Sequence, residues 1–432
     1  MGLSEKSGSP FFVLIKVERI AINRVHLTVS LCILPHIVLQ SFGKSFTVTL
    51  STKGKVTEMK NTNKKHNRKR LVIMIPASIL LLIVIAIILI PKILFTDYEG
   101  LPTTGPYEVA QASAILIDNN RIESFETDGS KREVPVYFYY PVTETEESCP
   151  LILFSHGAFG YYQSNTSTYM ELASHGYVVV SLDHPYHSFF TTDTTGKTII
   201  VNSAFIQDVM RVNEENMAED EIIALSHSWL EVRLADMNFV LDTIKEAKTA
   251  GVLQTSDWYV TDETVAGDIE TILAMTDTQT IGVMGHSLGG ASSVTLGRTR
   301  DDIDAVIDLD GTMLGEELGY ENGTYDFYKG EYPVPLLALS NEEHYLQGEE
   351  AGNLYVNHVV LANAKESHYT YFVGSGHMNF TDLPLFSPAL ASMLGVGEAD
   401  ATECIVTMNE IILSYYDFYL KGEGEFVLEE SY

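Results

Sequence analysis

The stretch of the chain that determines the fold is Ile281-Gly282-Val283-Met284-Gly285-His286-Ser287-Leu288-Gly289-Gly290. Its first four residues form an apolar run typical of a buried strand, and the small residues at 291–293 predict the start of a helix. Glycines on both sides of Ser287 allow a tight turn to pass close to neighbouring backbone, where a side chain would collide. A serine on such a strand-to-helix turn is typical of a nucleophile elbow. We therefore predict Ser287 as a nucleophile, against the alternative of a glycine-rich turn without chemistry.

Short apolar runs alternate with helical patterns on both sides of this stretch. The predicted strands cover residues 114–117, 134–140, 151–154, 177–182, 281–284, 305–309, 336–339 and 369–373. Helical patterns cover residues 169–174, 229–248, 291–298, 349–364 and 403–420. This alternation favours a mostly parallel central sheet with helices on both faces, which together with the elbow indicates the α/β-hydrolase fold. Residues 188–229 depart from the pattern and either cover a pocket or form a plain surface excursion.

A second candidate element is the end of the third predicted strand, which continues as Ser155-His156-Gly157-Ala158-Phe159-Gly160. In hydrolases of this fold, the loop after the third strand carries an amide that binds the oxyanion of the reaction. The backbone amides of Ala158 and Leu288 are the predicted pair of oxyanion donors. His156 is interpreted as structural, because the loop backbone rather than an imidazole ring serves this purpose.

A histidine downstream of the serine is needed to accept its proton. His377 lies in a glycine-rich loop directly after the last predicted strand, from which its ring can reach the serine. His344 follows the seventh predicted strand and is the serious alternative. His358 lies on a helical pattern, and His368 precedes a strand at the opposite end of the sheet. We predict His377 as the base.

A carboxylate must orient this histidine and stabilise its protonated form. Asp310 ends the sixth predicted strand, and the carboxyl ends of parallel strands gather at the catalytic edge of such a sheet. Asp308 lies two residues earlier on the same strand, so its side chain points to the same face of the sheet. It is either a second candidate for the catalytic acid or a buried, hydrogen-bonded carboxylate. Glu342 and Glu343 follow the seventh strand and are the alternative acids.

Charge divides the chain into a basic beginning and an acidic remainder. Residues 1–70 hold 13 lysines and arginines against 3 acidic residues, whereas residues 96–432 hold 13 against 55. A strongly acidic domain repels polyanions, which argues against nucleic-acid binding as its function. The same charge disfavours tight docking of this domain on an anionic membrane surface.

Residues 71–95 predict a transmembrane signal anchor. The run contains a single charged residue, Lys92, and an apolar helix of ~20 residues spans the hydrocarbon core of a bilayer. The basic flank at 64–70 predicts that this side stays cytoplasmic, so we expect a single-pass protein of the cell membrane with its catalytic domain outside. The expected segments are 1–70, basic and cytoplasmic or disordered; the anchor 71–95; a linker 96–110; and the hydrolase domain 111–425. Residues 1–58 are interpreted either as untranslated or as a disordered extension.

The cysteines and histidines show no metal-binding spacing. Cys149 and Cys404 could pair in an extracellular domain, but two buried thiols are the preferred interpretation. Hydrolysis through a serine nucleophile requires neither a metal nor a cofactor, so none is predicted.

Five segments resemble the platelet-activating factor acetylhydrolase family of the plasma type. They are residues 154–160, 171–179, 285–290, 309–311 and 374–380. The resemblance extends over roughly residues 110–420. It implies an acid after the sixth strand, which favours Asp310, and a calcium-independent release of short acyl groups, including acetyl, from phospholipids at a membrane surface. Leu288 stands where the family commonly has phenylalanine, and Asp310-Gly311-Thr312 replaces the family's Asp-Ala-Trp, so the pocket wall differs.

These observations predict a serine carboxylic-ester hydrolase that cleaves short acyl esters through an acyl-enzyme on Ser287. Small-molecule or lipid esters are the expected substrates, and the membrane is the expected partner of the anchor. On the same fold, the alternatives are a general carboxylesterase, a cutinase-like polyester hydrolase, a thioesterase or a peptidase. A catalytically silent binding domain is the alternative outside enzymes, and it is disfavoured because nucleophile, base and acid are all present.

Overall fold

The computed structural model describes residues 89, 92, 94–143, 148–212, 217–254 and 256–432. The basic segment 1–70 and nearly all of the predicted anchor at 71–95 lie outside these residues. Within the part of the chain that is described, no helix combines the length and the apolar character needed to cross a membrane. The anchor and the segment before it therefore stay predictions.

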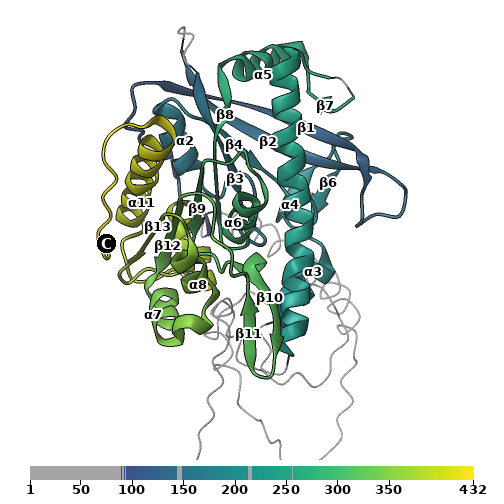
Figure 1. The fold of residues 1–432 in the computed structure, drawn as a ribbon. Coiled ribbons are helices and arrows are strands. Elements are labelled where there is room, and N and C mark those ends of the chain that lie inside the picture. The colour runs from purple at the N-terminus through teal and green to yellow at the C-terminus, as the bar shows by residue number, and fades with distance from the viewer. Residues whose placement is uncertain (1–88, 90–91, 93, 144–147, 213–216, 255) are drawn as a thin grey trace, which may run out of the picture. The chain divides into compact units, whose positions relative to one another are not determined.

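A nine-stranded sheet forms the centre of the described domain (Figure 1). From one edge to the other, its strands are β13 (Ser367–Phe372), β12 (Leu336–Asn341), β9 (Ala305–Leu309), β8 (Thr276–His286), β3 (Cys149–Ser155), β4 (Val178–Leu182), β2 (Lys131–Val142), β1 (Glu108–Ile122) and β7 (Trp258–Tyr259). Neighbours from β13 to β4 are parallel, whereas β2 is antiparallel to β4 and β1, and β7 is antiparallel to β1. The sheet is mostly parallel, as predicted, and it contains the eight predicted strands.

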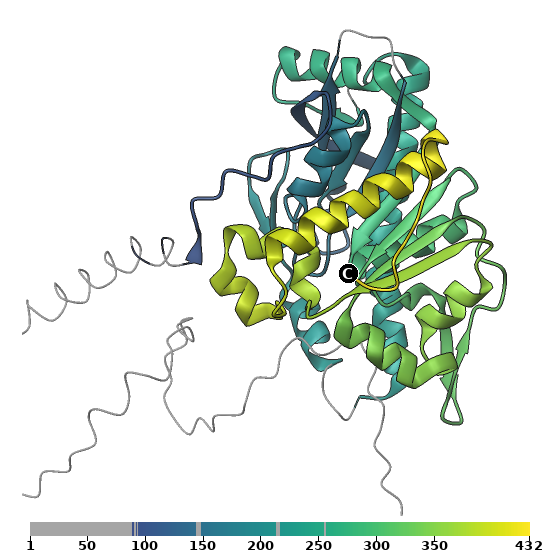
Figure 2. The same ribbon diagram turned by 90° about the vertical axis from the view of Figure 1, so that its left-hand side faces the viewer.

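Helices cover both faces of this sheet (Figures 1 and 2). One face packs against α4 (Glu219–Ala250), α5 (Glu263–Met275), α6 (Leu288–Thr299) and α8 (Val356–Asn363). The other face packs against α2 (Thr166–Ser174) and α11 (Ala401–Tyr416). Because both of their faces are covered, β3 and β4 are buried along their whole length, which accounts for sequences that are apolar apart from Ser155 and Ser181. The predicted three-layer arrangement is confirmed.

The two core layers also decide the state of two cysteines. Cys149 of β3 is buried in the core on one face of the sheet, and Cys404 of α11 is buried in the core on the other face. Side chains buried in the cores on opposite faces of one sheet point apart and cannot form a disulfide. Both residues are thiols, so the preferred interpretation is confirmed.

Shorter elements connect the layers. They are the hairpin β5 (Phe190–Thr192) and β6 (Thr198–Ile200), the hairpin β10 (Glu317–Glu321) and β11 (Thr324–Phe327), the helices α3 (Ser203–Arg211), α7 (Glu342–Ala351), α9 (Leu383–Phe386) and α10 (Pro388–Leu394), the short 3₁₀ helices η2 (Leu314–Glu316), η3 (Gly352–Leu354) and η4 (His377–Phe380), and the π-helix η5 (Asp417–Lys421). The single helix predicted over 349–364 is wrong. Gly352 adopts a positive φ of 56° and ends α7, so the chain turns before α8 begins.

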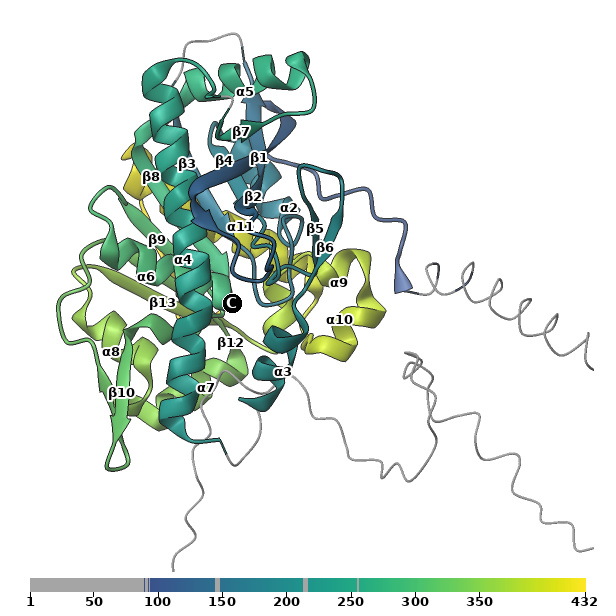
Figure 3. The ribbon, with the colours of Figure 1, turned by 90° about the vertical axis from the view of Figure 1, so that its right-hand side faces the viewer.

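The insertion at 188–229 folds into the β5–β6 hairpin, α3 and the first turns of α4, with 213–216 outside the described residues (Figure 3). Phe205 of α3 is buried in an apolar cluster that also contains Trp229 and Leu288. Leu288 directly follows the predicted nucleophile. The insertion therefore packs onto the candidate site, and the alternative of a plain surface excursion is wrong.

Two side chains of α11 provide a test of the layer packing. Ile412 is fully buried against the sheet, whereas Val406 on the same helix is 39% exposed. Ile412→Ala is expected to lower the free energy of unfolding by about 2–5 kcal/mol, because apolar contacts are lost and a cavity remains. Val406→Ala, the matched control, is expected to change it by less than about 0.5 kcal/mol. Urea unfolding of both purified variants measures the difference, and equal effects would contradict the described packing of α11.

Candidate active site

Ser287 lies on the turn between β8 and α6, as the sequence predicts. Its backbone adopts φ 56° and ψ −121°, a conformation that costs a non-glycine residue roughly 1–3 kcal/mol. A 2.8 Å hydrogen bond from its amide to the Leu309 carbonyl of β9 helps to hold this turn. Glycine is required at Gly289, because a Cβ there would lie 1.9 Å from the carbonyl oxygen of Ser155. A strained serine between strand and helix, closely packed on its neighbours, is the geometry of a nucleophile elbow.

The loop after β3 lies against this elbow. A Cβ on Gly157 would lie 3.3 Å from the Cβ of Ser287 and 2.8 Å from Nδ1 of His286, so the loop backbone contacts both residues. Among the described residues, none accepts a hydrogen bond from the amide of Ala158. Leu288 is the first residue of α6, where helix amides lack partners within the helix. The two predicted oxyanion donors thus belong to the two segments that meet at Ser287.

His377 begins the short 3₁₀ helix η4 in the loop after β13. Its Nδ1 lies 2.6 Å from Oδ2 of Asp310, the distance of a charge-assisted hydrogen bond. Its carbonyl accepts a 3.2 Å hydrogen bond from Nε2 of His286, and the centroids of the two imidazole rings lie 4.5 Å apart. Because His286 directly precedes Ser287, the loop that carries His377 lies against the elbow. The structure therefore brings the predicted base and the preferred acid together beside the predicted nucleophile.

Asp310 is buried directly after β9, and four neighbouring residues donate to its carboxylate, among them Ser340, whose hydroxyl lies 3.4 Å from Oδ1. Its Oδ1 accepts from the Asn341 amide at 2.8 Å and from Nδ1 of His344 at 3.0 Å. Its Oδ2 accepts from the Asn341 side chain at 2.6 Å, in addition to His377. Burial by itself would raise the pKa of Asp310, but the charges and hydrogen bonds of the two histidines hold that pKa well below its usual range. The carboxylate is thus ionised and fixed in one orientation.

Two other titratable groups beside the elbow are neutral because they are buried. Burial and the neighbouring His377 lower the pKa of His286 to about 3, so its imidazole stays uncharged and donates through Nε2. Burial and the charge of Asp310 raise the pKa of Asp308 well above its usual range. The Asp308 carboxyl accepts a 3.0 Å hydrogen bond from the amide of Gly311. Of the two interpretations of Asp308 drawn from the sequence, the structure therefore supports the buried, hydrogen-bonded group.

The alternative acids and the alternative base have other contacts. Glu342 accepts a 2.9 Å hydrogen bond from the amide of Gly374 and so holds the loop that carries the candidate base. Glu343 accepts a hydrogen bond from the exposed side chain of Gln347, one turn further along α7. His344 is hydrogen-bonded to the same carboxylate as the candidate base. The imidazole that contacts the elbow residue His286, however, is that of His377. These contacts favour the preferred assignments.

Asp310, His344 and His377 form a cluster that sequence spacing does not reveal. Each offers a ligand atom within 4.8 Å of the others, close enough to hold a metal ion. Both histidines direct Nδ1 at the carboxylate, which accepts only, so each Nδ1 carries a proton and offers no lone pair to a metal. The arrangement is that of an acid with two histidine partners. The histidines lie 34 and 67 residues from Asp310 in sequence, and their position after the last two strands is the only sequence signal.

The sheet order, the elbow and the acid–histidine pair define the chain as an α/β-hydrolase. The family model described as platelet-activating factor acetylhydrolase, isoform II, matches residues 109–430, and the chain belongs to this family.

Individual relatives are distant. The platelet-activating factor acetylhydrolases of Gallus gallus and Canis lupus familiaris are each 24% identical to the chain, over 296 and 289 residues that cover 65% of it. The chain spans 64% and 60% of the length of these two relatives. A ferulic acid esterase from Streptomyces cinnamoneus is 20% identical and superposes with a TM-score of 0.54, over 76% of this chain and 95% of that one. At this identity the likeness shows the fold alone.

The low pKa of Asp310 predicts an acid-dependent contribution to stability. The unfolded chain binds a proton at this residue near pH 4, whereas the folded chain binds it only at lower pH. The stabilisation is therefore present above about pH 4 and is lost as the pH falls through the folded-state pKa. The difference in unfolding free energy between the unaltered protein and Asp310→Asn is expected to narrow below about pH 4. Denaturant titrations from pH 7 to pH 3 measure it.

The control is Asp326→Asn, whose side chain is 60% exposed and pairs only with Lys329 among the described residues. The free energy of unfolding of Asp326→Asn should stay close to that of the unaltered protein at every pH. If the difference in unfolding free energy between the unaltered protein and Asp310→Asn is equally large at pH 7 and at pH 3, the carboxylate of Asp310 is not ionised and stabilised by histidines as described.

Proposed function

We propose that the protein is a serine carboxylic-ester hydrolase that acts through an acyl-enzyme on Ser287. The observation that carries the proposal is the 2.6 Å contact between His377 and Asp310, on a loop that packs against the elbow residue His286. The membership of the platelet-activating factor acetylhydrolase family supports the same reaction class. A silent binding domain would have no need for a strained serine beside an oriented histidine.

The geometry supports the following sequence of steps. Ser287 Oγ attacks the ester carbonyl while Nε2 of His377 takes its proton, since Nδ1 is engaged by Asp310. The ionised Asp310 stabilises the resulting imidazolium. The amides of Ala158 and Leu288 hold the oxyanion of the tetrahedral intermediate. His377 then protonates the leaving alkoxide, and a water molecule activated by the same histidine releases the acid from Ser287.

Short acyl groups are the proposed substrates. Leu288 is fully buried, and Phe205 and Trp229 pack over it in one apolar cluster. Ala158, the other proposed donor, packs against the same cluster. A filled apolar wall beside both oxyanion donors leaves little room for a long acyl chain. Acetyl esters of phospholipids fit this constraint and agree with the names of the relatives, while general carboxylesterase, cutinase-like, thioesterase or peptidase activity on the same site is the alternative.

The proposed location is the outer side of the cell membrane, with residues 71–95 as a single anchor. The apolar run with its basic flank supports this proposal. An anchored enzyme would meet lipid esters without the domain itself binding an anionic surface, which its excess of acidic residues disfavours.

Two histidines on one carboxylate provide a matched test of the mechanism. Ser287→Ala and His377→Ala are each expected to lower kcat for p-nitrophenyl acetate by about 10³-fold or more, because each removes a group of the proposed triad. His344→Ala removes another partner of Asp310 and is expected to lower kcat far less, because the contact between His377 and Asp310 stays in place. Steady-state kinetics on purified variants measures these values. Unchanged hydrolysis by Ser287→Ala would overturn the proposed function, and an equal loss in His344→Ala would contradict the assignment of His377.

The apolar wall predicts the acyl-chain preference. Phe205→Ala is expected to raise kcat/KM for p-nitrophenyl hexanoate relative to the acetate by about 10-fold, because the space of one aromatic side chain opens beside Leu288. Phe327→Ala is the control, since Phe327 is also buried but belongs to the core over the sheet. The ratio of the two kcat/KM values reports the effect. The same ratio in both variants would show that Phe205 does not line the acyl site.

A further inference from the structure

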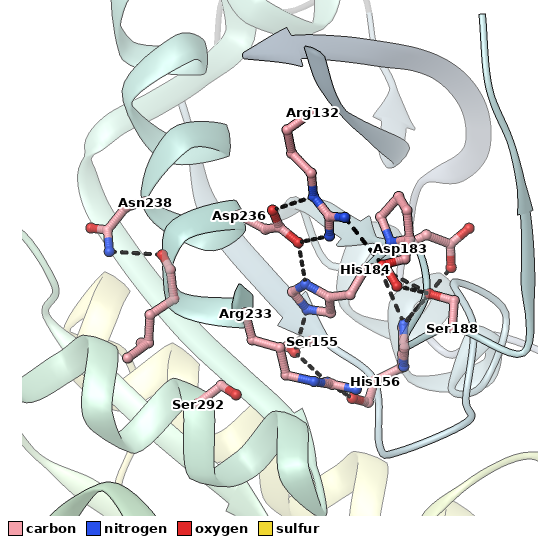
Figure 4. Close-up of polar contacts among 12 residues, drawn as sticks. Arg132, Ser155, His156, Asp183, His184, Ser188, Arg233, Asp236, Asn238 and Ser292 are labelled. Carbon is pink, nitrogen blue, oxygen red and sulfur yellow. Dashed lines mark hydrogen bonds and ion pairs between the residues drawn. The ribbon is translucent and has the colours of Figure 1, made fainter. Parts of the chain in front are cut away.

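Behind the loop that carries Ala158 lies a buried arginine that the steps above do not use. Arg233 of α4 is fully buried, and its guanidinium donates to the carbonyl of His156 and to the Ser155 hydroxyl (Figure 4). It also donates to the carbonyl of Gly157. The contacts to Gly157 O and Ser155 Oγ measure 3.2 and 3.3 Å. Within the described residues, this guanidinium forms no ion pair, and its Nε has no hydrogen-bond partner.

A cation in this position is costly to the fold. Removing a charge from water costs roughly several kcal/mol unless a counter-ion pairs with it. Burial lowers the pKa of Arg233, and the nearby charge of Asp236 opposes this shift only in part. Asp236 is itself bonded to Arg132 at 2.6 Å and to Arg121 at 2.5 Å. The domain therefore keeps a positive charge directly against the loop backbone.

The contact with Gly157 determines the direction of an amide in the proposed oxyanion site. In a trans peptide the C=O of one residue and the N–H of the next point in opposite directions. The C=O of Gly157 and the N–H of Ala158 belong to one such peptide unit. Arg233, Nδ1 of His156 and the amide of Gly160 all donate to the Gly157 oxygen, at 3.2, 2.7 and 3.1 Å. Because Arg233 comes from α4, the Ala158 amide points away from that helix.

A second chain of hydrogen bonds fixes the start of the same loop. Nε2 of His184 lies 2.9 Å from the Ser155 hydroxyl, and Nδ1 of His184 lies 3.0 Å from Asp236 (Figure 4). Burial and the charge of Arg233 lower the pKa of His184 to about 4, so it is neutral and links the two groups as donor and acceptor. Arg233 and Asp236 both come from α4, one turn apart. The helix thus holds the loop from two points.

We propose that Arg233 is a positioning residue for the oxyanion site, which aims the Ala158 amide and places its positive charge behind the Gly157–Ala158 peptide. The charge lies on the carbonyl side of this peptide and polarises it, so that the N–H on the other side becomes a stronger donor to a developing oxyanion. The inference rests on the proposed esterase function. It adds a residue to that function which neither touches the substrate nor exchanges a proton.

The test compares Arg233→Met and Arg233→Lys with the unaltered protein and with Arg298→Met. Arg298 is a suitable control, because it is also largely buried but pairs with Glu316 at 2.6 Å, outside this loop. Each protein is assayed for kcat and KM with p-nitrophenyl acetate. Each is then titrated with a short-chain trifluoromethyl ketone, whose carbonyl carbon bonds to the serine oxygen while its carbonyl oxygen becomes an oxyanion and the proton passes to the histidine.

Arg233→Met is expected to lower kcat by about 10- to 100-fold, below the ~10²–10³-fold cost of removing an oxyanion donor outright, with KM nearly unchanged. Its affinity for the ketone should fall by the same factor, because both reactions develop the same oxyanion. Arg233→Lys should recover part of both values, since an ammonium group keeps the charge and a donor. Arg298→Met should lower the melting temperature without changing the ratio of ketone affinity to KM.

Several outcomes would overturn the inference. If Arg233→Met folds and binds the ketone like the unaltered protein, the loop does not depend on this arginine. A lower kcat with unchanged ketone affinity would assign Arg233 a merely structural role. Arg233→Lys keeps the test decisive where Arg233→Met does not fold. If the unaltered protein hydrolyses the ester no faster than Ser287→Ala does, the result is of a different kind, because it overturns the proposed function itself.

Discussion

The close approach of two backbone segments, Gly289 at the start of α6 and Ser155 at the end of β3, is the constraint on which the rest of the site depends. A single Cβ at Gly289 would lie 1.9 Å from the Ser155 carbonyl oxygen, so no other residue fits there without movement of strand or helix. This contact requires β3 and β8 to be neighbours in the sheet, and Ser155 is indeed in register with Gly285. It brings the loop after β3 beside Ser287. One steric condition therefore places both proposed oxyanion donors at the same point.

Two aspartates on one strand show how the environment gives identical side chains different states. Asp308 and Asp310 are both buried, but the carboxyl of Asp308 contacts the amide of Gly311 while that of Asp310 meets Asn341 and two histidines. Burial dominates at the first and raises its pKa, whereas the histidines dominate at the second and lower its pKa. The neutral Asp308 packs against Gly290 beside the elbow, and the ionised Asp310 faces His377, the proposed base. Opposite pKa shifts of neighbouring acids are characteristic of sites that perform acid–base chemistry.

The fold and the centre of the site could be predicted from sequence, because they depend on local patterns. Short, mostly apolar runs identified the eight strands, and a serine between glycines identified the elbow. What local patterns could not supply depends on contacts between distant residues. His344 meets Asp310 only because β9 and β12 are neighbours, and Gly352 ends a helix that its apolar spacing would continue. Arg233 and Asp236 gave a weak signal, as charged residues within a predicted helix, but such residues are usually solvated.

The buried arginine also reconciles the proposed chemistry with the charge of the domain. Residues 96–432 hold 55 acidic residues against 13 basic ones, a balance that opposes the formation of another negative charge. Exposed charges act over a Debye length of about 8–10 Å at physiological ionic strength, because mobile ions screen them. Arg233 is fully buried and escapes this screening, so its field on the adjacent peptide exceeds that of more distant surface carboxylates. An acidic exterior, which keeps the domain soluble and away from polyanions, is thus compatible with an oxyanion site whose local field is set from within by α4.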